Sequence, residues 1–258
     1  MQDYLADNWR LILEHNGLRT FDDFWQREID WFEKPNYRRG GWSGVGRCEL
    51  KAPQGGTIVV FVKRQENHVT RTWRHPLRGM ATLQREFDNL LSFQSNQLPA
   101  PAPLYFAGRR VEGKLRAVLI TEELTGFRSL EAWTEEWTRS GWPPIATRKR
   151  IIEAVANVIR QMHAHRFQHN CLYAKHVFLK PAASGEVEVR IIDLEKARRR
   201  WWRRLAVHRD LDTLHRHTPG WRRSDRVRFL VAYLQVKDVR MARPLWRALE
   251  RLSRKKAG

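Results

Sequence analysis

Three charged residues in this sequence have types and positions suited to binding a phosphate group and a metal ion. Lys63 ends the apolar run 58–62, where a lysine is unusual unless its ammonium group has a use. Glu86 lies in the next stretch of helical pattern and could pair with Lys63. Asp193 follows the run 189–192, and an acidic residue that ends a buried strand is well placed to hold Mg²⁺. Together the three residues favour phosphoryl transfer.

A glycine-rich stretch, residues 40–46, precedes the lysine and is expected to form a turn. Backbone N–H groups in such a turn can approach phosphates closely. The expected nucleotide contacts in it are Gly41, Ser43, Gly44 and Gly46. Each feature also has an ordinary alternative, namely a plain hairpin turn, a strand-end lysine, an exposed helical glutamate and a capping aspartate. The four features in this order are more specific than any one alone.

The elements that must position these residues follow from hydrophobic periodicity. Strands are predicted at 57–63, 104–107, 115–122, 177–179 and 187–192. Helices are predicted at 82–93, from Ser129 onward, at 151–162, and near 205–216, 223–236 and 243–253. Residues 1–35 are predicted to be helical and amphipathic, and residues 64–79 to form a polar loop. This order indicates an α+β fold in two lobes, with the boundary in the crossover 121–126.

The composition is that of a folded protein. Hydrophobic residues make up 42% of the 258 positions, which is enough to bury a core. Two cysteines exclude a disulfide scaffold and fit a reducing compartment. No apolar run is long enough to cross a membrane, and the acidic N-terminus has no apolar signal core, so a soluble, cytoplasmic protein is expected.

The formal net charge is +20, and most of it lies near the C-terminus. Residues 196–258 hold 20 Lys and Arg against 5 Asp and Glu, a net charge of +15. The densest part, residues 196–204, includes Trp201 and Trp202, which favours contact with amphipathic anions such as a membrane surface. A solvated basic face is the ordinary alternative. Nucleic-acid binding is disfavoured, because no zinc-finger spacing or RNA-binding aromatic motif is present.

Six short stretches carry a resemblance to a known family. They are Val62-Lys63-Arg64, His75-Pro-Leu-Arg-Gly79, Arg85-Glu86-Phe87, His169-Asn-Cys-Leu-Tyr-Ala-Lys-His176, Ile192-Asp-Leu-Glu195 with Ala197-Arg198, and His208-Arg-Asp-Leu-Asp212. The chain resembles the lipopolysaccharide kinase family, which includes Kdo kinase, WaaP and InaA types, and it looks closest to InaA-type proteins. The resemblance covers about residues 38–236.

The resemblance implies a two-lobed protein-kinase-like fold. A helical segment (1–35) would precede a small β-rich N-lobe (36–124) and a mainly helical C-lobe (125–258). The implied reaction transfers the γ-phosphoryl group of ATP, with Mg²⁺, to a heptose or Kdo hydroxyl of the lipopolysaccharide inner core. The implied partners are this anionic glycolipid and, through residues 196–204, the inner face of the inner membrane. Oligomeric state has no signal in the sequence.

Carried over by position, the resemblance gives roles to five residues. Lys63 would hold the nucleotide phosphates, Glu86 would orient Lys63, and Glu122 in the crossover would contact the nucleotide. Asp193 would bind Mg²⁺. His176 stands where protein kinases place a second metal ligand, and a hydrogen-bonding role is its alternative because imidazole is a poor ligand for a hard cation.

The catalytic loop departs from the family pattern at Cys171, which replaces the Asp that accepts the acceptor's proton. The expected catalytic residues are His169, Cys171 and Asp193, with Asp210 as a buried brace under the loop. Three hypotheses follow: a slow kinase with a thiol as weak acceptor, a kinase that uses His169 or Asp210 as base, and a regulatory pseudokinase of the stress-associated InaA type. Cys171 could also act as a nucleophile or redox switch, with a buried structural thiol as the alternative.

Overall fold

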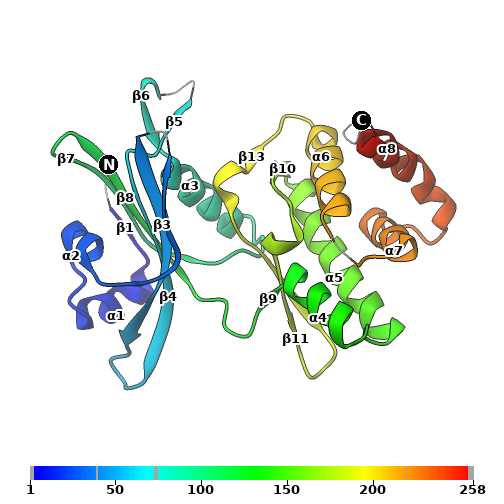
Figure 1. The fold of residues 1–258 in the computed structure, drawn as a ribbon, viewed down its shortest axis with the longest axis horizontal. Coiled ribbons are helices and arrows are strands. Elements are labelled where there is room, and N and C mark those ends of the chain that lie inside the picture. The colour runs from blue at the N-terminus through cyan, green and yellow to red at the C-terminus, as the bar shows by residue number, and fades with distance from the viewer. Residues whose placement is uncertain (1–2, 39, 73–74, 219, 255–258) are drawn as a thin grey trace. The chain divides into compact units, whose positions relative to one another are not determined.

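A six-stranded antiparallel sheet organises the first of two structural units. The computed structural model describes residues 3–38, 40–72, 75–218 and 220–254, without the side chains of residues 33, 34, 38, 71, 72, 75–78 and 203–205. Unit 1 comprises Met1–Ser92 and Pro101–Leu124, and unit 2 comprises Phe93–Ala100 and Thr125–Gly258. Figure 1 shows the elements of each unit.

The sheet of unit 1 has the strand order β1-β7-β8-β4-β3-β2. Its strands are β1 (Tyr4–Leu5), β2 (Asp30–Arg38), β3 (Gly41–Lys51), β4 (Thr57–Glu66), β7 (Pro103–Val111) and β8 (Lys114–Glu122). Alternation along β4 sends Val60 and Val62 into a hydrophobic cluster with Phe21 and Phe24 of the N-terminal segment. The strands predicted at 57–63, 104–107 and 115–122 are therefore confirmed, with longer bounds.

The sequence predicted that residues 1–35 are helical, and this prediction was wrong for much of the segment. After a 3-10 turn (η1, Asp7–Trp9), it forms two short helices, α1 (Arg10–His15) and α2 (Phe21–Gln26). Gly17 has a φ of 71°, which ends the first helix, and a capping box between Thr20 and Asp23 begins the second. Both helices pack on the sheet, so this segment belongs to unit 1.

The glycine-rich stretch forms a strand rather than the predicted turn. Residues 41–46 are the first half of β3 and pair with both β2 and β4. Only Gly40, with a φ of 75°, lies in the turn that precedes the strand. The prediction of a turn over 40–46 was therefore wrong beyond its first residue.

The polar stretch 64–79 is also more regular than predicted. β4 continues to Glu66, and a hairpin of β5 (Val69–Thr72) and β6 (His75–Ala81) follows. Gln65, fully buried, accepts hydrogen bonds from the Thr82 hydroxyl (2.7 Å) and the Leu83 N–H (3.0 Å) and donates one to the His68 carbonyl (2.9 Å). This amide ties β4 to the start of α3 (Thr82–Ser95). The side chains of residues 75–78, in the His75-Pro-Leu-Arg-Gly79 motif, lie outside the described residues.

Unit 2 is mainly helical, as the sequence predicted. Its helices are α4 (Leu130–Ser140), α5 (Ile145–Ala164), α6 (Arg203–Arg216), α7 (Arg223–Leu234) and α8 (Arg243–Arg254), with 3-10 turns η2 (Ala174–His176), η3 (Leu194–Lys196) and η4 (Val239–Ala242). Its strands are β9 (Arg128–Ser129), β10 (Phe167–Gln168), β11 (Val177–Pro181), β12 (Val187–Ile191) and β13 (Arg198–Arg199). Among the described residues, no helix has the length and apolar content that a membrane crossing requires.

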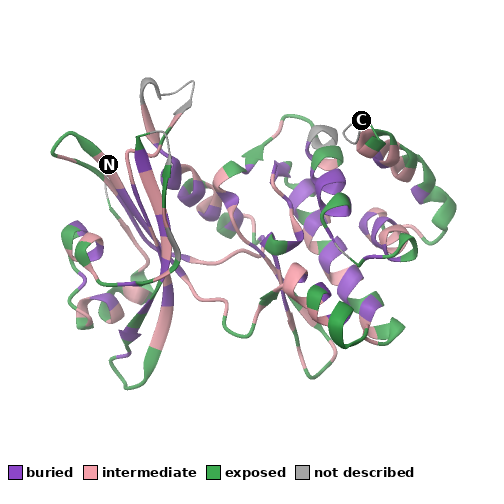
Figure 2. Ribbon diagram, in the orientation of Figure 1, coloured by how far each residue is buried: buried purple, intermediate pink, exposed green. Residues whose placement is uncertain are grey.

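Helix α5 forms the centre of unit 2. Ile151, Ile152, Val155, Ile159 and Met162 are all buried at the spacing of one helical face. Figure 2 shows the resulting band of buried residues along α5. Ser129 caps the start of helix α4, and its hydroxyl accepts the Ala132 N–H (3.1 Å), as the sequence predicted.

A buried ion pair of unit 2 joins α5 to the start of α7. Arg148 donates to the Asp225 carboxylate, and the two side chains are 10% and 1% exposed. Asp225 also accepts the Arg222 N–H (3.1 Å) at the start of α7 and a hydrogen bond from Arg228 (3.2 Å). The pair therefore fixes one end of α7 against the central helix.

Replacing Arg148 with Met should lower the free energy of unfolding by about 3 kcal/mol, because a buried carboxylate then loses its main counter-charge. The measurement is urea unfolding followed by circular dichroism. Lys149→Met is the matched control, since the exposed Lys149–Glu153 pair (3.8 Å) should contribute less than about 0.5 kcal/mol. Equal losses in the two variants would contradict this account of α7.

Candidate functional site

The first group of candidate residues centres on Lys63 in unit 1. Its Nζ atom lies 2.6 Å from Oε1 of Glu86 on α3. The Glu86 side chain is only 6% exposed and that of Lys63 22%, so this is not a surface pair. A partly buried ammonium held by a buried carboxylate keeps one orientation. The structure thus brings together the two residues that the spacing had paired.

The three glycines of β3 have packing reasons for being glycine. A Cβ atom at Gly44 would lie 2.5 Å from the Trp31 ring, and one at Gly46 would lie 2.7 Å from the Asp30 carbonyl oxygen. At Gly41 it would lie 2.4 Å from the Glu66 carbonyl oxygen. These positions are filled by atoms of the chain itself, so the glycines give room to neighbouring strands. Ser43, on the same strand, pairs across the sheet with Gln65 and Asn36.

Glu122 serves as a local brace at the end of β8. Its Oε1 accepts the Ala102 N–H (2.9 Å), and its own N–H donates to the Ala102 carbonyl oxygen (3.1 Å). The carboxylate thus ties the end of β8 to the residue before β7. A nucleotide contact at this position would have to come from another atom of the residue.

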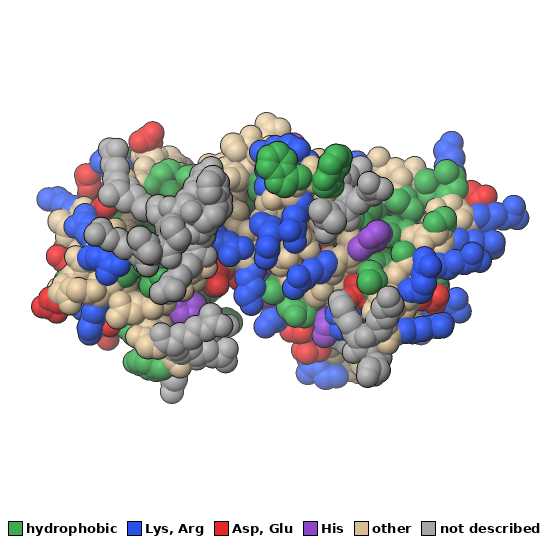
Figure 3. Space-filling view, turned by 90° about the horizontal axis from the view of Figure 1, so that it is seen from above, with side chains coloured by type: hydrophobic (Ala, Val, Ile, Leu, Met, Phe, Trp, Pro, Cys, Tyr) green, Lys and Arg blue, Asp and Glu red, His purple; other side chains and the backbone are tan. Residues whose placement is uncertain are grey.

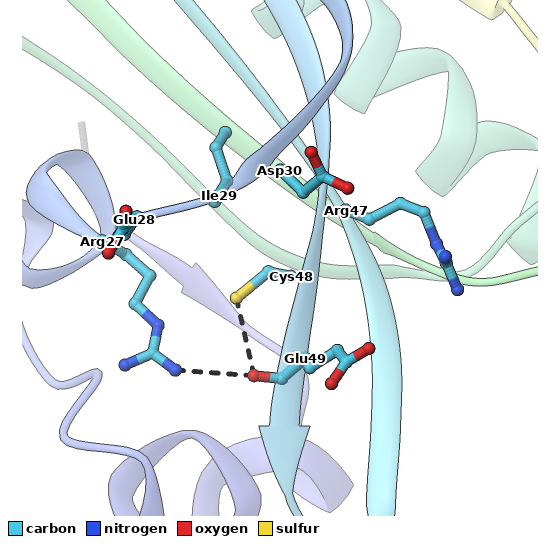
Figure 4. Close-up of a pocket in the computed structure, with 7 residues that line it drawn as sticks. All are labelled: Arg27, Glu28, Ile29, Asp30, Arg47, Cys48 and Glu49. Atoms are coloured by element: carbon cyan, nitrogen blue, oxygen red, sulfur yellow. Dashed lines mark hydrogen bonds between the residues drawn. The ribbon is translucent and has the colours of Figure 1, made fainter.

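An open hollow of about 610 Å³ lies elsewhere in unit 1, where the link from α2 to β2 meets β3 (Figure 4). Its lining mixes two arginines with three carboxylates and contains Cys48, whose thiol lies 3.8 Å from the Glu49 carbonyl oxygen. The lining residues are Arg27, Glu28, Ile29, Asp30, Arg47, Cys48 and Glu49. None of the candidate residues is among them, and the mixed charge does not favour a phosphate.

The second group of candidates is built on Asp210 in unit 2. This carboxylate is fully buried on α6 and accepts the N–H groups of His169 (2.6 Å) and Asn170 (2.8 Å). Its Oδ2 also lies 3.3 Å from Nε2 of His163, whose Nδ1 lies 3.0 Å from the Tyr233 hydroxyl. Asp210 therefore braces the loop that begins at residue 169. Sequence reasoning missed His163 and Tyr233, which have no local motif.

His169 is fully buried with both ring nitrogens in use. Its Nε2 lies 2.9 Å from the Ile192 carbonyl oxygen, which can only accept, so Nε2 carries the proton. Nδ1 then accepts the Cys171 N–H (3.3 Å). The ring holds the loop against the residue before Asp193. The Nδ1 lone pair of His169 is used by the Cys171 N–H, and Asp210 is fully buried with three hydrogen-bond contacts, so the structure disfavours either group as the replacement base.

Cys171 contributes to the loop through its backbone. Its carbonyl oxygen accepts hydrogen bonds from Nδ1 of His176 (2.7 Å) and the N–H of Tyr173 (2.8 Å). The residue is partly exposed, and among the described residues its thiol has no hydrogen-bond partner. The Tyr173 ring contacts both His176 and His217, with ring centroids 5.7 and 4.9 Å away. His217 was not singled out from the sequence.

His176 and Asp193 face each other with Nε2 and Oδ2 3.2 Å apart. Burial lowers the pKa of His176 below the ordinary histidine value, although the Asp193 carboxylate acts in the opposite direction. The lowered pKa favours the neutral ring at pH 7; in that form the proton is on Nδ1, which donates to the Cys171 carbonyl oxygen. Nε2 thus presents a lone pair to a carboxylate oxygen.

Two electron-pair donors at this distance fit a bound cation. The Asp193 side chain is 40% exposed and its φ is 60°, the left-handed conformation that Asp tolerates. No group of three or more His, Cys, Asp or Glu side chains placed so that they could hold a metal ion occurs in the described part of the chain. Mg²⁺ commonly takes one or two protein ligands and completes its shell with water and substrate phosphates. The residues present therefore suit a nucleotide-bound metal ion.

Comparison with known proteins identifies the family to which the chain is similar. The profile of the Lipopolysaccharide kinase (Kdo/WaaP) family matches residues 22–233. Protein InaA of Escherichia coli K12 is 32% identical over 197 residues, which is 76% of this chain and 87% of that protein. The lipopolysaccharide core heptose(I) kinase WaaP of Pseudomonas aeruginosa is 31% identical over 127 residues, 45% of this chain and 46% of its own length.

The fold is shared with a solved structure over nearly the whole chain. A structure of WaaP in complex with acyl carrier protein matches with a TM-score of 0.70 at 21% identity and covers 99% of both chains. The predicted α+β, two-lobed, protein-kinase-like fold is thereby confirmed. The chain belongs to the lipopolysaccharide kinase (Kdo/WaaP) family.

Proposed function

We propose that this protein is an ATP-dependent phosphotransferase that acts on a heptose or Kdo hydroxyl of the lipopolysaccharide inner core. The observation that carries the proposal is the Lys63–Glu86 ion pair, a phosphate-binding arrangement in a chain of a lipopolysaccharide kinase family. The similarity to heptose(I) kinases supports the acceptor class.

The roles of the residues follow from their surroundings. Lys63 binds the phosphates of ATP and Glu86 holds its ammonium group in place. Asp193 and His176 would hold Mg²⁺, which would neutralise part of the phosphate charge. Gly41, Ser43, Gly44 and Gly46 are proposed to lie beside the nucleotide on β3, although the backbone of this strand also pairs with β2 and β4.

The chemistry at Cys171 makes the reaction slow. A thiol is a weaker proton acceptor than the carboxylate it replaces, and general-base catalysis contributes about 10²–10⁴-fold. Phosphoryl transfer passes through a loose transition state, so loss of the base reduces the rate without abolishing it. His169 acts as a positioning residue, because its ring holds the loop.

A regulatory pseudokinase that binds nucleotide without turnover is the second candidate function. Two observations favour it: the thiol at residue 171, and similarity to protein InaA over 76% of the chain. The fold and the residues that bind nucleotide and metal would be the same in both cases. Only the transfer of the phosphoryl group separates the two.

The proposed location is the cytoplasmic side of the inner membrane, where the glycolipid acceptor is accessible. Trp201 and Trp202 are 88% and 67% exposed in the link between β13 and α6. Lys196, Arg198 and Arg199 are exposed beside them, while the side chains of Arg203 and Arg204 lie outside the described residues. Exposed tryptophans with basic neighbours suit an anionic membrane surface.

Replacing Lys63 with Met, or Asp193 with Asn, should lower ATP-dependent labelling of purified inner-core lipopolysaccharide at least about a hundredfold, because each removes a charge that contacts the transferred group or its metal ion. The measurement is transfer of radiolabelled phosphate from ATP. Lys114→Met is the control, since that lysine pairs with Glu66 at the surface (3.3 Å). Labelling that survives both substitutions would contradict the proposed function.

Replacing Cys171 with Asp should raise the transfer rate by about 10²-fold or more, because a carboxylate restores the proton acceptor. Cys171→Ser should leave the rate close to that of the unmodified protein, since neither side chain is an effective base. The measurement is the single-turnover rate with inner-core lipopolysaccharide. If the unmodified protein and Cys171→Asp both bind Mg-ATP but transfer no phosphate, the result would favour the pseudokinase. Loss of transfer in Cys171→Ser would indicate a nucleophilic thiol.

Replacing His176 with Asn should lower Mn²⁺ affinity at least about tenfold while changing Mg²⁺ affinity little, because imidazole is a better ligand for Mn²⁺ than for Mg²⁺. The measurement is electron paramagnetic resonance of Mn²⁺ with a nonhydrolysable ATP analogue, and competition by Mg²⁺. His217→Asn is the control. Unchanged Mn²⁺ affinity in His176→Asn would show that this histidine is not a metal ligand.

A further inference from the structure

The C-terminal helix α8 carries an unusual stripe of arginines, which we call the arginine stripe. Arg240, in the preceding turn η4, and four arginines of α8 recur every three or four residues, so they share one face. These residues are Arg240, Arg243, Arg247, Arg251 and Arg254. They line an open groove of about 680 Å³ together with Pro244 and Glu250.

The stripe faces outward. All five arginines are exposed, whereas Leu249 on the opposite face of α8 is 3% exposed. The Trp246 side chain contacts α7, where the Arg223 guanidinium lies 5.4 Å from the centre of its ring. Ser253 donates to the buried Asp212 on α6 (2.9 Å), which ties α8 to the body of unit 2. The apolar face of α8 is thus used for packing and its basic face is left at the surface.

The arginines of the stripe are not held in ion pairs within the described part of the chain. No ion pair of these five guanidinium groups occurs among the described residues, although Glu250 lies in the same groove. Figure 3 shows Lys and Arg side chains gathered over the end of unit 2 that α8 forms. Five like charges along one helix repel one another and favour an anionic ligand.

We propose that the arginine stripe is a docking surface for the anionic phospholipids of a bilayer. A guanidinium group binds phosphate with two parallel hydrogen bonds, and the stripe contains arginines only, without lysine. Val239 and Met241, which flank Arg240, are 48% and 61% exposed. Exposed apolar side chains beside arginines suit the headgroup region of a bilayer and give no advantage on the phosphates of a nucleic acid.

The mode of attachment follows from the packing of α8. The apolar face of α8 is buried against the rest of unit 2. The helix therefore binds the bilayer surface by electrostatic attraction and does not insert. This surface is separate from the Trp201–Trp202 segment and does not depend on phosphotransfer. It extends the proposed membrane contact to a second element of unit 2.

The test is flotation of the full chain with vesicles of phosphatidylglycerol and phosphatidylcholine in equal parts. The test variant replaces Arg243, Arg247 and Arg251 with Gln at the same time. Its vesicle partitioning should fall about a hundredfold, since each basic residue near an anionic surface strengthens membrane binding about fivefold. The matched control replaces Arg10, Arg19 and Arg110 with Gln, which changes the net charge equally on exposed positions of unit 1. It should lower partitioning less than about threefold.

Four outcomes would overturn this proposal. Equal losses in the two triple variants would show that only net charge matters, and equal binding to pure phosphatidylcholine vesicles would show that anionic lipid is not recognised. Loss of binding in Trp201→Ser with Trp202→Ser, but not in the α8 variant, would leave the earlier membrane proposal and remove this one. Tighter binding to a DNA duplex than to the vesicles, lost in the α8 variant, would assign the stripe to nucleic acid. Circular dichroism of the α8 variant checks that it folds.

Discussion

The arrangement of the candidate site depends on one buried carboxylate. Asp210 accepts two consecutive backbone N–H groups of the loop and contacts His163, so the loop has one conformation on α6. From that fixed loop, His169 reaches the residue before Asp193 and His176 reaches Asp193 itself. A buried carboxylate is costly unless it is hydrogen-bonded. The groups that satisfy Asp210 are His169, Asn170 and His163, so the same hydrogen bonds that stabilise it also position the loop.

The two units place their functional groups by different means. In unit 1, Lys63 is held by a strand in the middle of a sheet and oriented by one buried carboxylate. In unit 2, the candidate residues lie on a loop and are positioned by a network of backbone hydrogen bonds. A strand allows little change of backbone at Lys63, whereas the loop presents several side chains within a few residues.

Local patterns predicted the elements and the principal charged residues, and long-range contacts decided the rest. The periodicity of α5 and the spacing of Lys63 and Glu86 are carried by short stretches of sequence. The strand at residues 41–46 required knowledge that Trp31 occupies the space beside Gly44. The hairpin after Glu66 is organised by Gln65, whose partners lie up to 18 residues away. His163 and Tyr233 meet across 70 residues, and no motif links them.

The backbone role of Cys171 separates the shape of the loop from its chemistry. The N–H and the carbonyl oxygen of this residue make the contacts that hold the loop, and any amino acid except proline supplies both groups. The hydrogen bonds that shape the loop therefore do not depend on the Cys171 side chain. A change of side chain at residue 171 can thus alter the chemistry offered by the loop while the backbone contacts that shape it stay the same.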